Sequence, residues 1–160
     1  MDPASYGGCF KNTEVMLNDD CQDPKGAVVE AVVDELLEEV GRTYKDNGKI
    51  PDEVLSALNN VFQSSLLPAL ELVDSHNVTK VTCPAGRALY QVIGSSGTPY
   101  TCFLSSRYCS CPSYQFSCLK KGDHLMCKHV LAVRLCEAMG GVRELDVTNQ
   151  EITNMLKQLE

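Results

Sequence analysis

The residues with the clearest capacity for chemistry are cysteines and histidines in one short stretch. Between positions 109 and 129 lie four of the chain's nine cysteines and two of its three histidines. Two half-motifs stand out there, Cys109-x-Cys111 and, after fifteen intervening residues, Cys127-x-His129. Three thiolates and one imidazole form a complete tetrahedral set for Zn²⁺. The spacing therefore predicts one zinc ion held by these four side chains.

The local structure around each half-motif must let two side chains converge. Residues two apart share a face of a strand, but in a helix they lie about 200° apart around the axis. We therefore expect Cys109 and Cys111 at a strand end that has begun to turn, which the following Pro112 favours. Cys127 should lie at a helix start and His129 in its first turn, with the helix dipole facing the thiolates.

Four protein ligands indicate a structural rather than a catalytic metal. A catalytic zinc usually has three protein ligands and keeps an open position for water. The sequence also contains no H-E-x-x-H motif, no G-x-S-x-G motif and no glycine-rich phosphate loop. We therefore predict a zinc ion that stabilises the fold and a protein that is not an enzyme.

Other interpretations of these residues stay open at this point. Cysteine is among the most buried residue types, so a C-x-C could be core, and a redox pair is a second option. Cys118 and His124 are alternative candidate ligands. We expect Cys118 to lie in the middle of a helix with its side chain in the protein core, and His124 to be exposed in a loop. Cys83 and Cys102 are interpreted as small apolar residues of strands. Nine cysteines without a secretory leader pattern favour thiols or ligands over disulfides.

Apolar periodicity predicts an α+β fold. Residues 1–26 are predicted to be a flexible extension, 27–76 a helical region, 77–143 a zinc-binding region and 144–160 a C-terminal helix. Within these regions the predicted helices are 27–44, a second from Pro51, 66–73, 113–119 and one from Cys127; the predicted strands are 78–83, 88–93 and 100–104, forming a small antiparallel meander. Thr148 and Glu151 form a capping-box pattern before an amphipathic terminal helix.

Charge is distributed unevenly around a net value of −7. Residues 1–76 carry fifteen acidic and five basic side chains, whereas residues 77–143 carry two acidic and eight basic ones. A basic half can neutralise phosphates. The candidate DNA contacts are Arg107, Lys120, Lys121, Lys128 and Arg134. Exposed aromatic rings for base stacking are expected to be few, because Phe116 is predicted to pack inward.

Several stretches carry a resemblance to a known family. They are Ile50-Pro51-Asp52-Glu53, Ala69-Leu70-Glu71-Leu72-Val73-Asp74, Tyr90-Gln91-Val92-Ile93-Gly94-Ser95-Ser96, Tyr100-Thr101-Cys102, Tyr108-Cys109-Ser110-Cys111-Pro112 and Cys127-Lys128-His129-Val130-Leu131-Ala132-Val133. Together they resemble the SWIM zinc-finger family, and within it the SWIM subunits of Shu-type complexes. The likeness covers about residues 27–160, and all four predicted ligands match the family pattern.

The resemblance implies a role without catalysis. Members of this family pair with a RecA-like recombinase paralogue as a heterodimer. The pair supports a recombinase filament on single-stranded DNA during homologous recombination repair and meiosis, which implies a nuclear protein.

Two surfaces are candidates for contacts with such partners. The terminal helix offers an apolar face of Ile152, Met155, Leu156 and Leu159, and the first helix offers an acidic face. Either could instead close on the chain's own domain. Direct binding of single-stranded DNA by the basic residues is the alternative function. No apolar run approaches the ~18 residues that would span a bilayer, so no membrane contact is expected.

Overall fold

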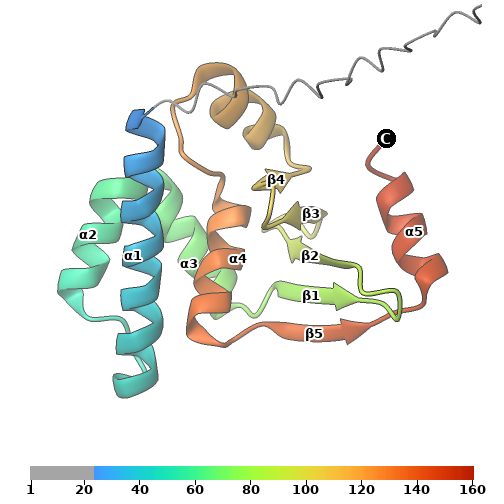
Figure 1. The fold of residues 1–160 in the computed structure, drawn as a ribbon, viewed down its shortest axis with the longest axis horizontal. Coiled ribbons are helices and arrows are strands. Elements are labelled where there is room, and N and C mark those ends of the chain that lie inside the picture. Colours follow the sequence, from blue (N-terminus) through green and yellow to red (C-terminus); the bar gives the residue numbers. More distant parts are fainter. Residues whose placement is uncertain (1–23) are drawn as a thin grey trace, which may run out of the picture.

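A computed structural model describes residues 24–160 as helices packed on a mixed β-sheet, which confirms the predicted α+β class (Figure 1). In chain order the elements are α1 Pro24–Asn47, α2 Asp52–Phe62, a 3₁₀ turn (η1) Gln63–Ser65, α3 Leu66–Asp74, β1 Val78–Thr82, β2 Ala88–Ile93, β3 Pro99–Phe103, β4 Tyr108–Cys109, a π-helix (η2) Tyr114–Lys121, α4 Lys128–Met139, β5 Arg143–Asp146 and α5 Asn149–Lys157. None of these helices has the length and apolar character needed to cross a membrane.

The N-terminal helices agree with the apolar periodicity, with small shifts at their ends. α1 begins at Pro24, so the last three residues of the predicted flexible extension belong to this helix. The rest of that extension, including Cys9 and Cys21, lies outside the described residues. Pro51 is the N-cap of α2 and not its first helical residue. α1, α2 and α3 form a layer on the side of α4 that faces away from the sheet (Figure 1). Within this layer α1 and α3 contact α4.

The sheet has the strand order β4-β3-β2-β1-β5. The antiparallel meander of β1 to β3 was predicted, and β4 lies at the strand end expected at Cys109, but β5, which pairs in parallel with β1, was not predicted. All four residues of β5 are exposed. An edge strand with no buried face has no alternation of apolar and polar residues, so periodicity could not reveal it. β5 crosses the predicted boundary at residue 143, and the last two predicted regions therefore share one sheet.

Helix α4 is the centre of the fold. It lies between α1 and α3 on one side and the sheet on the other (Figure 1). Its buried residues are His129, Val130, Leu131, Ala132, Val133, Leu135 and Cys136. The hydroxyl of Tyr90 in β2 donates a hydrogen bond to the Glu137 carboxylate, which links α4 to the sheet. Burial makes the largest contribution to raising the pKa of Tyr90, and this hydrogen bond makes the next largest.

Helix α5 covers part of the opposite face of the sheet (Figure 1). Ile152 is 1% exposed and belongs to a small core cluster with Val81, Cys83 and Leu89. The predicted capping box is confirmed, since Thr148 Oγ1 accepts from the Glu151 amide and the Glu151 carboxylate accepts from the Thr148 amide at 2.7 Å. Ile152 is one of the candidate partner contacts, and it is instead buried in the chain's own core. Met155 and Leu156 also pack against this cluster, and Leu159 is half-buried.

Candidate metal centre

The four predicted ligands converge between the edge of the sheet and the start of α4. Cys109, Cys111, Cys127 and His129 are all buried, and their ligand atoms lie within 4.8 Å of one another. β4 ends at Cys109, and α4 begins one residue after Cys127, which is its N-cap. The local geometry predicted for both half-motifs is thus confirmed. The helix dipole of α4 favours negative charge at this end.

Backbone amides stabilise two of the three sulfurs. The Tyr114 amide donates to Cys111 Sγ at 3.3 Å, and the Val130 amide donates to Cys127 Sγ at 3.5 Å. The hydrogen bond from Cys109 makes the largest contribution to lowering the pKa of Cys111, and the one from Cys127 makes the next largest. Hydrogen bonding within the cluster raises the pKa of Cys127, chiefly through Cys109. Zinc binding must therefore displace protons from the less acidic thiols.

His129 gives an independent test of whether these residues fit a metal. Among the described residues, neither ring nitrogen of His129 has a hydrogen-bond partner, although both are buried. A buried polar atom without a partner costs about 1–3 kcal/mol. Coordination of zinc by one nitrogen would satisfy it. The ring packs on Tyr100 with the two centroids 4.4 Å apart, which holds the imidazole in place. The Cys₃His group can therefore bind one zinc ion.

The competing ligands lie outside this cluster. Cys118 is half-buried and packs against the main core, as expected, while His124 is half-buried and not fully exposed. Phe116 is 54% exposed, so the prediction that it packs inward is wrong. The segment Tyr114–Lys121 has the wider turns of a π-helix. Those turns change which residues share a face compared with the α-helical spacing assumed from sequence.

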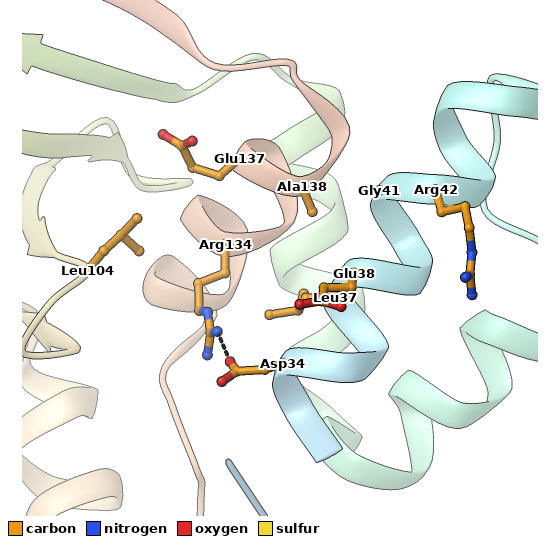
Figure 2. Close-up of a pocket in the computed structure, with 9 residues that line it drawn as sticks. All are labelled: Asp34, Leu37, Glu38, Gly41, Arg42, Leu104, Arg134, Glu137 and Ala138. Carbon is orange, nitrogen blue, oxygen red and sulfur yellow. Dashed lines mark hydrogen bonds and ion pairs between the residues drawn. The ribbon is translucent and has the colours of Figure 1, made fainter. Parts of the chain in front are cut away.

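The five candidate DNA contacts do not form a single free patch. Arg134 pairs with Asp34 across the groove between α1 and α4 (Figure 2). Arg107 pairs with Glu30, which also lies on α1. Burial, and then the nearby Arg134, lowers the pKa of Arg107. The remaining three basic residues are Lys120 and Lys121, which are exposed at the end of η2, and Lys128, which is half-buried. The acidic face of α1 thus serves in part to bind the chain's own arginines.

Sequence reasoning missed two residues whose side chains lie beside the ligands. Tyr100 packs on His129, and Cys102 lies opposite Cys109 in the β3–β4 pair. Strand alternation would have placed Cys102 on the same face as Cys109, but only if the register of the two strands had been known.

Comparisons with known proteins agree with this geometry. Residues 100–136, which include all four ligands, match a family model described as SWIM zinc finger. The mouse protein named Zinc finger SWIM domain-containing protein 7 is 46% identical over 127 residues, covering 79% of this chain and 84% of the relative. The zebrafish (Danio rerio) protein of that name is 45% identical over 133 residues (83% and 95%), and the human one is 45% identical over 129 residues (81% and 92%). This chain therefore belongs to the family of zinc finger SWIM domain-containing protein 7.

Proposed function

We propose that this protein is a non-enzymatic, zinc-stabilised adaptor subunit of a Shu-type complex. It pairs with a RecA-like recombinase paralogue, and the pair promotes assembly of the recombinase filament on single-stranded DNA in homologous recombination repair and meiosis, in the nucleus. The observation that carries this proposal is the buried Cys₃His group. Four protein ligands complete a tetrahedral shell, so the metal has no position for a substrate and acts through the surface that it stabilises.

An apolar groove near the start of α1 is the surface we assign to the RecA-like partner. The groove has a volume of about 400 Å³ and is lined by Val29, Val33, Leu125 and Met126, among others. Val28 and Val32 lie on the same helix and are 64% and 44% exposed. Apolar side chains gathered on one exposed face mark protein interaction sites.

Acidic substitutions in this groove should abolish pairing. We expect the chain and the RecA-like paralogue to co-elute in size exclusion after co-expression, and the double variant Val29→Asp/Val32→Asp to elute alone, because unpaired carboxylates would be buried at the interface. Leu67→Asp is the matched control, since Leu67 is 69% exposed on α3 and should leave pairing intact. A wild-type chain that remains monomeric beside the paralogue would contradict the adaptor function. A double variant that still pairs would contradict only the assigned groove.

Direct binding of single-stranded DNA is a second candidate, favoured by the exposure of Phe116. Lys121 Nζ lies 4.8 Å from the centre of the Phe116 ring, and Lys120 is its exposed neighbour. Exposed aromatic rings stack on bases while lysines neutralise phosphates. This segment therefore combines both kinds of contact in eight residues, Tyr114–Lys121.

Charge reversal in this segment should weaken DNA binding. For Lys120→Glu/Lys121→Glu we expect at least about a tenfold loss of affinity for a fluorescent oligothymidylate, and a shallower dependence of affinity on salt, because fewer counterions are released. Phe116→Ala should lower affinity without changing the salt dependence. The matched control is Lys45→Glu/Lys49→Glu, two exposed lysines near the far end of α1. Equal affinities for the wild type and the η2 variants would rule out this segment as the DNA site.

A further inference from the structure

A fifth cysteine lies directly beside the zinc-binding group. Cys102 in β3 and Cys109 in β4 are Cα partners in the antiparallel pair, and both are 0% exposed. Side chains directly opposite each other in such a pair point to the same face, with Cβ atoms about 4.5–5.5 Å apart. Cys102 is not one of the four grouped ligands. Its sulfur is therefore placed to contact one ligand and not the metal.

The thiol of Cys102 faces the sulfur of Cys109 across the strand pair, within reach of a hydrogen bond. When Cys109 binds a metal as thiolate, the thiol of Cys102 is the partner that can still donate.

The three ligand sulfurs thus each have a hydrogen-bond donor nearby. Cys111 and Cys127 receive theirs from the backbone amides of Tyr114 and Val130. Those amides are provided by the turns themselves and do not depend on side-chain identity. Only the donor to Cys109 depends on the identity of a side chain.

We propose that Cys102 is a positioning residue of the zinc centre, whose thiol donates a hydrogen bond to the metal-bound sulfur of Cys109. Three thiolates and one neutral imidazole around Zn²⁺ leave one net negative charge in a buried site. Donors to the sulfurs disperse that charge and fix the orientation of each ligand, and the loss of such an outer partner commonly costs 10–100-fold in metal affinity. Cys102 therefore contributes to metal affinity and is more than an apolar residue of the strand.

Variants at Cys102 separate these two roles. Cys102→Ala removes the donor and some volume, Cys102→Val removes the donor and adds some volume, and Cys102→Ser keeps a donor. The matched control is Cys136→Ala, because Cys136 is an equally buried thiol of α4 outside the zinc-binding group. Each full-length variant is titrated with zinc against a chromophoric chelator, and its cobalt-substituted form is examined for the thiolate-to-cobalt charge-transfer band.

We expect Cys102→Ala and Cys102→Val to lose about 10–100-fold in zinc affinity and to shift the charge-transfer band. Cys102→Ser should keep both close to wild type, and Cys136→Ala should lose melting temperature but not zinc affinity. The proposal is overturned if Cys102→Val binds zinc as tightly as the wild type with an unshifted band. It is equally overturned if Cys136→Ala lowers affinity as much as Cys102→Ala. Should Cys102→Ala fail to fold, the valine and serine variants still decide between the two roles.

Discussion

Replacing Cys127 with serine should leave the described domain largely unfolded at 37 °C. Structural zinc sites are worth about 10–16 kcal/mol in small domains, which is comparable to the whole stability of an ordinary domain. Cys127 joins the metal to the start of α4, and α4 contacts α1, α3 and the sheet. The loss should therefore spread beyond the zinc-binding region. Zinc content by mass spectrometry and melting by circular dichroism measure both effects.

The choice of serine isolates the metal from the helix cap. Cys127 Sγ accepts the Val130 amide as an N-cap, and serine is itself a favourable N-cap residue. A large loss in Cys127→Ser thus reports on the metal and not on the start of α4. The control is Cys118→Ser, because Cys118 is half-buried and outside the cluster. Unchanged zinc content and melting in Cys127→Ser would contradict a structural metal at this site.

Replacing Gly41 with valine should destabilise the protein by about 3 kcal/mol, since overpacking a close contact typically costs 1–3 kcal/mol and occasionally more. Gly41 lies where α1 crosses α4 (Figure 2), and a Cβ atom on it would be 2.9 Å from the Ala138 carbonyl oxygen. That oxygen belongs to the backbone and cannot rotate away. α1 would have to move outward, which also disturbs the Arg134–Asp34 pair in the same groove. A loss of this size should lower the melting temperature by roughly 10 °C.

Gly141→Val is the control for this substitution, because a Cβ atom at Gly141 would meet nothing within 4 Å. Urea unfolding of both variants with zinc in excess measures the difference in free energy. A Gly41→Val protein as stable as Gly141→Val would show that the two helices separate at little cost. It would contradict the close crossing of α1 and α4.

The sequence was sufficient to predict the four residues that form the candidate metal centre and most of the helices and strands. Cys109, Cys111, Cys127 and His129 are identifiable because coordination chemistry restricts ligands to a few residue types at short spacings. The amphipathic helices and the meander are identifiable because burial of one face imposes a period of 3.6 or 2 residues. Both signals are local, so a single pass along the chain contains them.

The tertiary structure decided which residues that are distant in the sequence pack or pair with one another. Periodicity shows that a face is buried but not which element covers it, so the burial of Ile152 against β1 and β2 could not be foreseen. Charges carry no directional pattern, and Arg134 binds Asp34, which is 100 residues away. Phe116 is exposed because η2 is a π-helix, whose wider turns change which residues share a face. The contact of Cys102 with Cys109 depends on strand register, which is set when the sheet assembles and not by either strand alone.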